Sequence, residues 1–217
     1  MRAYVLHGID DLRLEETALP EIKEREVLVK VMAAGICGSD IPRIYKTGTY
    51  SYPLIPGHEF SGTVIETGLK ADKKWMGKRV GIFPLIPCGE CESCRKKQYE
   101  MCRHYSYLGS RTNGGFAEYA AVPEENLIEL PEEVSYEVAA MLEPMAVAVH
   151  AMRKSGVMKE NTVVVYGLGT IGLLLCMFLL DAGVRDIYAI GNKEFQKRMA
   201  DSLGISETHY CDCRTRE

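Results

Sequence analysis

The hydrophobic pattern divides the chain into two stretches with different periodicities. Up to about residue 150, short β-branched runs are separated by glycine and proline, and eight of the nine prolines lie before residue 132. Residues 26–33 partly alternate apolar and polar positions, and residues 62–66 and 79–83 are β-branched runs beside glycines. These features predict short strands joined by turns, followed by a helical region over residues 136–150 that is interrupted at Pro144.

The pattern changes after Lys154. Residues 162–166 are apolar on both faces, which is typical of a strand in a parallel sheet covered on both sides. A helix is predicted over residues 171–180, a second strand over 186–190 and a second helix over 195–203. This β-α-β-α order predicts the start of a Rossmann-type, doubly wound parallel sheet.

The predicted parallel sheet is incomplete. A dinucleotide-binding sheet of this type normally has about six strands, whereas only two strands and two helices fit after Thr162. We therefore expect the chain to be a fragment of a longer protein. The expected domains are residues 1–153 and residues 154–217, the second being the truncated N-terminal part of a dinucleotide-binding domain.

The composition narrows the class of protein. With 217 residues, 47% hydrophobic and 26% charged, the chain is an ordinary globular sequence. Its formal net charge of −4 argues against nucleic acid as a partner, because phosphate binding needs a basic excess. The uncharged segment 161–180 is long enough to cross a bilayer, but its glycines and β-branched run favour a strand, a turn and a buried helix. We expect no membrane partner and a cytoplasmic location.

Four of the eight cysteines form the most specific local motif. Their spacing, Cys88-x2-Cys91-x2-Cys94-x7-Cys102, lets four thiolates converge on one tetrahedral zinc ion with no vacant position. The alternatives are disulfides or free thiols in a loop. Disulfides between residues three apart would be strained, and a reducing compartment would break them. We therefore predict a structural zinc lobe over about residues 84–106.

A second set of potential zinc ligands is spread over the chain. Cys37 lies in a glycine-containing turn, His58 follows about twenty residues later, and Glu143 lies much further on. Three protein ligands with an open fourth position are typical of a catalytic zinc. Spacing alone supports a catalytic zinc only weakly. A lone cysteine is more often a small core residue, and a lone histidine is more often a surface or core residue with its hydrogen bonds satisfied.

A glycine fingerprint connects the first strand and helix of the second stretch. In the segment Gly167-Leu168-Gly169-Thr170-Ile171-Gly172, the first glycine would allow a tight turn and the second a close approach of a pyrophosphate. The third would let the helix pack on the strand, and the helix N-terminus would face the phosphates. The alternative is a glycine-rich packing turn without a ligand.

Six motifs in sequence order resemble those of the zinc-dependent medium-chain dehydrogenases. The likeness covers nearly the whole chain and is greatest to the polyol branch of the family, through residues 37–46 and 108–119. The motifs are Cys37-Gly-Ser-Asp40, Gly57-His58-Glu59, the four-cysteine segment, Gly114-Gly-Phe-Ala-Glu-Tyr119, Glu143-Pro144 and the glycine fingerprint.

The resemblance implies a mixed β and α/β fold, with a GroES-like β domain ahead of the incomplete Rossmann-type sheet. It implies that Cys37, His58 and Glu143 ligate a catalytic zinc, so that the chain holds two zinc ions, one catalytic and one structural. Glu59 would be a ligand in some states, and Asp40 would orient His58.

The resemblance also implies an activity. We expect hydride transfer between a secondary alcohol of a polyol or polyol phosphate and NAD or NADP, giving a keto sugar. Ser39 would relay the substrate proton outward through the cofactor ribose, although a turn hydroxyl bonded to local backbone is the alternative. The partners expected are a small-molecule substrate and further copies in a homodimer or homotetramer.

The cofactor preference rests on a departure from the usual pattern. An acidic residue that binds the adenosine ribose of NAD is expected about twenty residues after the fingerprint. The sequence there is Gly191-Asn192-Lys193, without a carboxylate. A ribose 2′-phosphate would meet no repulsion and could pair with Lys193, which favours NADP. The alternative is NAD with a weaker ribose contact, for which Glu194 would substitute.

Two other functions compete with a zinc dehydrogenase. One is a zinc-free reductase of the same superfamily acting on quinones or enones, against which the trio Cys37, His58 and Glu143 argues. The other is a zinc-stabilised binding module without turnover, which the missing strands favour for this chain by itself.

Overall fold

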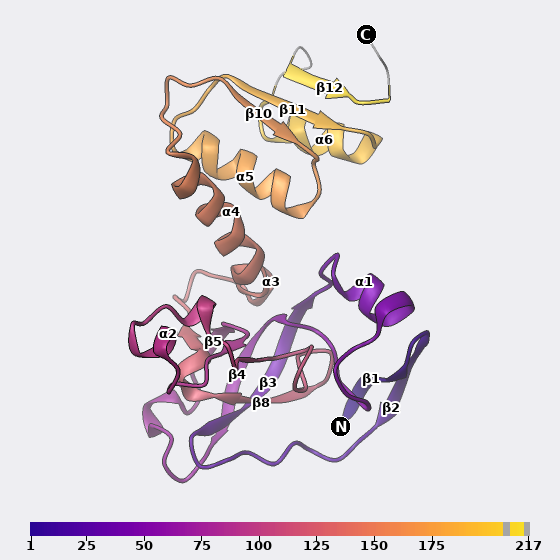
Figure 1. Ribbon diagram of the computed structural model, residues 1–217, viewed down its shortest axis with the longest axis vertical. Helices are drawn as coiled ribbons and strands as arrows, with labels where there is room; N and C mark the ends of the chain where they lie inside the picture. The colour runs from indigo at the N-terminus through magenta and orange to yellow at the C-terminus, as the bar shows by residue number, and fades with distance from the viewer. Residues whose placement is uncertain (206–208, 215–217) are drawn as a thin grey trace. The chain divides into compact units, whose positions relative to one another are not determined.

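The computed structural model describes residues 1–205 and 209–214, and the chain divides into two compact units (Figure 1). Unit 1 is Met1–Glu143 and unit 2 is Pro144–Glu217. The boundary expected from the sequence, between residues 153 and 154, lies inside helix α4 (Leu142–Ser155). Each unit is described by itself below.

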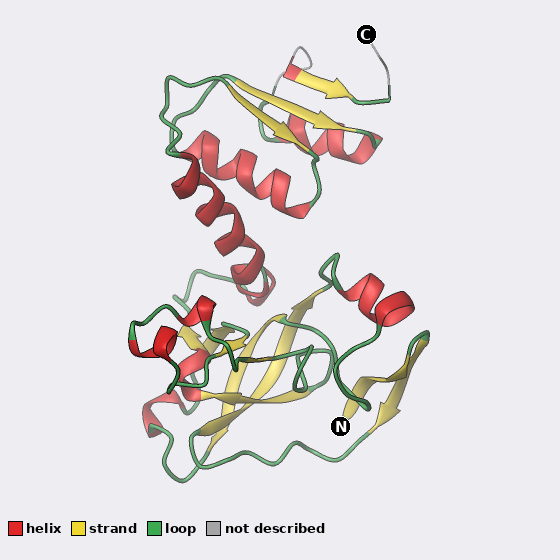
Figure 2. Cartoon of the chain, viewed as in Figure 1, coloured by secondary structure: helices red, strands yellow, loops and turns green. Residues whose placement is uncertain are grey.

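Unit 1 is built mainly of β-sheet (Figure 2). Its five-stranded antiparallel sheet has the order β8-β3-β4-β5-β9, and β1-β2 and β6-β7 form two-stranded sheets. The strands are β1 (Arg2–Gly8), β2 (Asp11–Glu16), β3 (Glu26–Gly35), β4 (Glu59–Thr67), β5 (Arg79–Ile82), β6 (Leu85–Ile86), β7 (Ser106–Tyr107), β8 (Tyr119–Pro123) and β9 (Leu127–Glu129). The predicted strands at 26–33 and 62–66 are thus confirmed as parts of β3 and β4. The strand predicted at 79–83 is β5, which ends one residue earlier, at Ile82.

Short helical segments connect these strands. The α-helices of this unit are α1 (Asp40–Pro42), α2 (Glu92–Arg95), α3 (Tyr136–Ala140) and the first residues of α4. The tighter or wider turns are η1 (Arg43–Thr47), η2 (Lys73–Trp75), η3 (Tyr99–Met101) and η4 (Glu124–Asn126). The core of the unit lies on one face of the five-stranded sheet, where Val29, Phe60 and Val80 of three neighbouring strands are at most 1% exposed.

The pairing of β3 with β4 brings two distant segments together. The strands are antiparallel, and their last pair joins Gly35 to Glu59. The residues that follow β3 in the chain therefore lie beside the residues that precede β4. A Cβ atom at Gly35 would lie 3.2 Å from the Glu59 Cβ and would collide with its carboxylate, so a larger residue there would make the Glu59 side chain move.

The helical region is not interrupted at Pro144, where the sequence predicted a break. Helix α3 ends at Ala140, and α4 begins at Leu142 and runs through Pro144 to Ser155. Proline is tolerated in the first turn of a helix because the N–H groups there have no intrahelical acceptor. The break therefore falls at Met141, three residues before the expected place.

Unit 2 is a parallel βαβαβ unit. Its strands pair in the order β10-β11-β12. The elements are β10 (Val163–Tyr166), α5 (Thr170–Asp181), β11 (Ile187–Gly191), α6 (Glu194–Ser202) and β12 (Tyr210–Asp212). The two strands and two helices predicted from the sequence are confirmed. The expectation that β10 is covered on both faces is wrong, because Val164 is 61% and Tyr166 77% exposed. The expectation of only two strands is wrong, because a third short strand pairs with β11 over Ala189–Gly191.

One buried cluster joins helices α5 and α6 of unit 2 to its sheet. Val165 and Ala189 of the strands pack with Cys176 of α5 and Ala200 of α6, each at most 4% exposed. Among the described residues, no helix is both long enough and apolar enough to span a bilayer. The apolar segment 161–180 is instead a strand, a turn and a helix, as its glycines predicted. The helix is only partly buried, because Leu174, Cys176 and Leu179 are buried whereas Met177 is exposed.

We expect Gly114→Ala to destabilise unit 1. A Cβ atom there would press on the backbone of Gly57 and would lie 2.7 Å from the backbone nitrogen of Gly109. Such overpacking costs about 1–3 kcal/mol of unfolding free energy, measurable by denaturant unfolding. Gly8→Ala is the matched control, because a Cβ at Gly8 meets nothing within 4 Å. Equal stability of the two variants would contradict this account.

Candidate metal centres and nucleotide fingerprint

The turn that carries Cys37 is held by a buried carboxylate. Asp40 is 0% exposed, and its Oδ2 accepts the backbone N–H of Cys37 at 3.0 Å. Its Oδ1 accepts from the Arg43 guanidinium at 2.7 Å. Burying this charge would be costly without such partners, so the pair with Arg43 stabilises the turn. Asp40 thereby fixes the position of the Cys37 backbone.

Cys37, His58 and Glu59 form one compact group of potential metal ligands. One donor atom from each lies within 4.8 Å of the others. Cys37 follows β3, whereas His58 and Glu59 stand at the start of β4, so the strand pairing assembles the group. Thiolate, imidazole and carboxylate are all common zinc ligands, and three of them leave a fourth position open.

The buried polar atoms of this group fit a cation. His58 is 5% exposed, and its Nδ1 has no hydrogen-bond partner in the part of the chain that the structure describes. The Asp40 Oδ1 lies 3.6 Å from that nitrogen, too far for a hydrogen bond. Burial raises the pKa of the Glu59 carboxyl, partly offset by the charge of His58. The donor set of a thiol, an imidazole and a largely buried carboxylate suits a divalent cation such as zinc.

Glu143 lies outside this group of donor atoms. Its Oε1 accepts a hydrogen bond from the Tyr107 hydroxyl at 3.1 Å. The Tyr107 ring also stands edge-on to His58, with the ring centroids 5.8 Å apart. Burial and the charge of Glu143 raise the pKa of Tyr107 above its ordinary value. The sequence motifs did not point to Tyr107, because only the β6-β7 pairing brings it here.

Ser39 stands at the other side of the Cys37 turn. It is exposed and precedes α1, and its side chain makes no capping hydrogen bond to that helix. This excludes a helix cap as its role, while the choice between a relay and a hydroxyl bonded to local backbone stays a prediction. The hydroxyl is available to a ligand two residues from Cys37.

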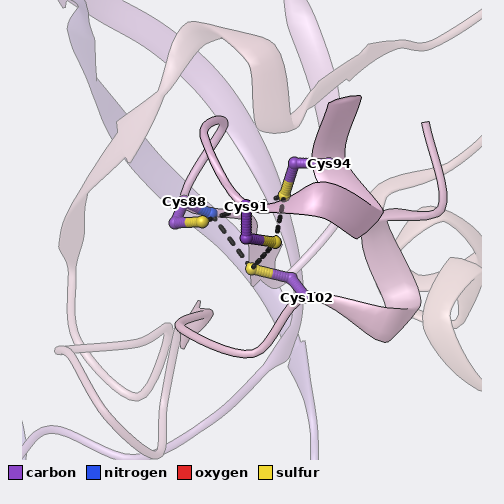
Figure 3. Close-up of side chains that lie close together, drawn as sticks. All are labelled: Cys88, Cys91, Cys94 and Cys102. Atoms are coloured by element: carbon purple, nitrogen blue, oxygen red, sulfur yellow. Dashed lines mark hydrogen bonds between the residues drawn. The ribbon is translucent and has the colours of Figure 1, made fainter. Parts of the chain in front are cut away.

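The four-cysteine lobe is assembled as its spacing predicts (Figure 3). The sulfurs of Cys91 and Cys94 are 3.5 Å apart, and those of Cys91 and Cys102 are 3.9 Å apart. Zn–S bonds of about 2.3 Å in a tetrahedron require sulfur separations of ~3.8 Å. All four cysteines are free thiols, so the disulfide alternative is absent from these described residues.

Backbone donors favour thiolates in this lobe. The N–H groups of Arg103 and Cys94 lower the pKa of Cys91. The N–H of Cys88 donates to the Cys102 sulfur at 3.3 Å and lowers its pKa as well. Burial raises the pKa of Cys94. The lobe thus combines a closed cage of sulfurs with donors directed at them, which is typical of a structural zinc site.

The glycine fingerprint lies between β10 and α5. Gly167 has φ of +96°, a left-handed conformation that favours glycine. A Cβ at Gly169 would meet nothing within 4 Å, so that backbone is open to a ligand. A Cβ at Gly172 would collide with the Gly167 carbonyl, as expected for close packing of helix on turn. Leu168 is buried, and Thr170 and Ile171 form the exposed first turn of α5.

A glutamine side chain accepts hydrogen bonds from the backbone that follows β11. The Gln196 Oε1 accepts the backbone N–H groups of Asn192 at 2.9 Å and Lys193 at 3.1 Å. A Cβ at Gly191 would lie 2.9 Å from the same oxygen. A carboxylate at Gly191, the position expected for the ribose contact, would therefore have to displace Gln196.

Comparison with known proteins supports this description. The model of the alcohol dehydrogenase GroES-like domain family matches residues 23–132, and the chain belongs to this family. It is 39% identical to galactitol 1-phosphate 5-dehydrogenase of Escherichia coli K12 over 91% of the chain and 57% of the relative. It is 41% identical to D-arabitol-phosphate dehydrogenase of Enterococcus avium over 81% of the chain and 51% of the relative.

A solved structure agrees in fold. A protein of Sinorhizobium meliloti described as a zinc-binding dehydrogenase bound to NADP superimposes with a TM-score of 0.90 and 31% identity, covering 97% of this chain and 61% of that one. The expected GroES-like and medium-chain dehydrogenase architecture is thereby confirmed. The chain spans about half to three fifths of the length of these proteins.

We expect Cys91→Ser to remove one equivalent of zinc per chain. Losing one of four thiolates opens the cage and weakens the metal site, because serine is a poor zinc ligand. Elemental analysis of the purified chain measures the change. Cys213→Ser is the control, because Cys213 is exposed and lies outside both ligand groups. Unchanged zinc in Cys91→Ser would contradict the assignment.

Proposed function

We propose that this chain is part of a zinc-dependent dehydrogenase that transfers hydride between a secondary alcohol of a polyol or polyol phosphate and NAD(P). The observation that carries the proposal is the convergence of Cys37, His58 and Glu59 donor atoms within 4.8 Å. A four-thiolate lobe elsewhere in the same chain offers a second, closed zinc site. One closed and one open site together are typical of a zinc alcohol dehydrogenase rather than a zinc-free reductase.

The open site would act through its metal and its surrounding residues. Zinc supplies Lewis-acid polarisation of a substrate oxygen when bound. Cys37 and His58 would hold it, together with a glutamate. We favour Glu59 as the source of the carboxylate, because its donor atom lies with those of Cys37 and His58. Glu143, the ligand implied by the resemblance, accepts a hydrogen bond from Tyr107.

Ser39 would move the substrate proton. Its exposed hydroxyl lies two residues from Cys37 and forms no capping bond to α1. A hydroxyl can accept one proton while donating its own, which suits a relay from a buried alcohol towards solvent. Asp40 and Arg43 hold the turn that presents it.

The cofactor would bind at the fingerprint of unit 2, with NADP preferred. Gly169 is open to a pyrophosphate at the N-terminus of α5. No carboxylate stands at Gly191, and Lys193 follows two residues later, exposed. The Sinorhizobium protein with the same fold was solved with NADP. Glu194 begins α6 and would be the ribose contact if NAD were used instead.

The proposed substrate class follows from the relatives. The two relatives described above are named for the phosphates of galactitol and arabitol. We therefore favour a polyol phosphate over a free polyol. A cytoplasmic location suits the lobe, because a reducing compartment keeps the four cysteines as thiols.

A substrate panel tests the proposal. The protein in the full form that its gene encodes is assayed with sorbitol, galactitol, iditol and their phosphates, each with NAD and NADP. We expect turnover of a polyol phosphate, with kcat/KM at least ~10-fold higher for NADP than for NAD. Cys37→Ala is the control and should abolish turnover. The proposal fails if zinc-loaded protein turns over none of these substrates, as a non-catalytic binding module would behave.

Ser39→Ala should separate the proton relay from metal binding. We expect kcat to fall by about 10²-fold, as for loss of a general acid–base group, while zinc content stays unchanged. Steady-state kinetics and elemental analysis measure the two effects. Ser106→Ala, which removes a hydroxyl from β7, is the control. Normal turnover in Ser39→Ala would exclude the relay.

A further inference from the structure

Tyr107 contacts two parts of the candidate metal site at once. Its hydroxyl donates to the Glu143 Oε1 at 3.1 Å, and its ring stands edge-on to His58 at 62° between planes. The residue is half-buried at the end of β7, where pairing with Leu85 of β6 fixes its backbone. Tyr107 therefore links a member of the ligand group to a carboxylate outside that group.

Two glutamates are available for one ligand position. The Glu59 carboxylate lies with Cys37 and His58, and its backbone is fixed by pairing with Gly35. Glu143 is close enough that its charge helps to raise the pKa of Glu59. If both carboxylates reached one ion, four protein ligands would close the site, and a closed site has no position for a substrate.

We propose that Tyr107 is a positioning residue that holds Glu143 away from the metal, so that Glu59 alone completes the ligand set and the fourth position stays open. This inference rests on the proposed zinc site. A hydrogen bond from a neutral hydroxyl to a carboxylate is among the stronger hydrogen bonds in proteins. It satisfies Glu143 without a metal and restrains its direction. Without the hydroxyl, Glu143 would lose that partner and would compete for the ion.

The proposal is tested by zinc affinity in the 217-residue chain, without an activity assay. Glu59→Gln and Glu143→Gln are each made with Tyr107 intact and with Tyr107→Phe. Zinc per chain is then measured after dialysis against graded chelator. With Tyr107 intact, we expect Glu59→Gln to weaken the second zinc site by at least ~10-fold and Glu143→Gln by less than ~3-fold. In the Tyr107→Phe chain, Glu143→Gln should now weaken it by at least ~10-fold.

Tyr105→Phe is the matched control. Tyr105 lies against Tyr107 with ring centroids 6.5 Å apart, but its hydroxyl has no contact with Glu143 among the described interactions. Its loss should leave the effect of Glu143→Gln unchanged. If removing a hydroxyl simply loosened this segment, both phenylalanine variants would change the effect of Glu143→Gln on zinc affinity. If Tyr107 positions Glu143, only Tyr107→Phe changes that effect. A cooperative denaturant-unfolding transition, with a midpoint close to that of the unaltered chain, shows that each variant is folded.

The outcomes separate this inference from the proposed function. If the unaltered chain holds only the zinc of the four-cysteine lobe, the open site itself is refuted. If it holds two zinc ions but Glu143→Gln has the same effect with and without the Tyr107 hydroxyl, only the role of Tyr107 is refuted. Equal loss of zinc in Glu59→Gln and Glu143→Gln, with Tyr107 intact, also refutes it.

Discussion

The antiparallel pairing of β3 with β4 is the constraint on which the candidate site depends. It ends on Gly35 and Glu59, and this pair brings the turn after β3 against the start of β4. Cys37 and His58 are thereby held on neighbouring backbone, each one or two residues beyond the ladder. The register is fixed because shifting a strand by one residue would expose its buried face. Val29 and Val64, which pair across these strands and are at most 1% exposed, oppose such a shift.

Charge distribution around the open site follows from burial. Asp40 is fully buried and receives two donors, one of them the cationic Arg43. Glu143 accepts a hydrogen bond from the Tyr107 hydroxyl. Glu59 is different, because burial raises its pKa and its chief favourable charge comes from His58. A bound cation would therefore favour the charged form of this carboxylate.

The two candidate zinc sites are assembled by different means. The four-cysteine lobe takes all its ligands from residues 88–102, so that short turns are enough to bring the sulfurs together. Its loop-closure entropy is small because the loops are short. The open site takes ligands from the end of β3 and the start of β4, and a neighbouring side chain from a second sheet, β6-β7, so it exists only when unit 1 is folded. The four-cysteine lobe can therefore form a closed cage from local turns. The geometry of the open site instead depends on the fold of the whole unit.

The sequence by itself determined what depends on local spacing. The four-cysteine lobe, the glycine turn after β10 and most strands and helices follow from residue type and periodicity over a few residues. The break at Met141 and the third strand at Tyr210–Asp212 were missed, because a proline in a first turn and a three-residue strand give weak local signals. Resemblance supplied the GroES-like fold and named Cys37, His58 and the two glutamates.

Only the tertiary structure decided which of these residues meet. It placed the donor atom of Glu59 near those of Cys37 and His58. It also formed the hydrogen bond from Tyr107 to Glu143, and the one from the backbone after β11 to Gln196. None of these contacts is encoded by spacing, because each joins segments that strand pairing or helix packing brings together. The sequence shows which chemical groups a side chain carries, but the folded backbone determines which other side chains it contacts.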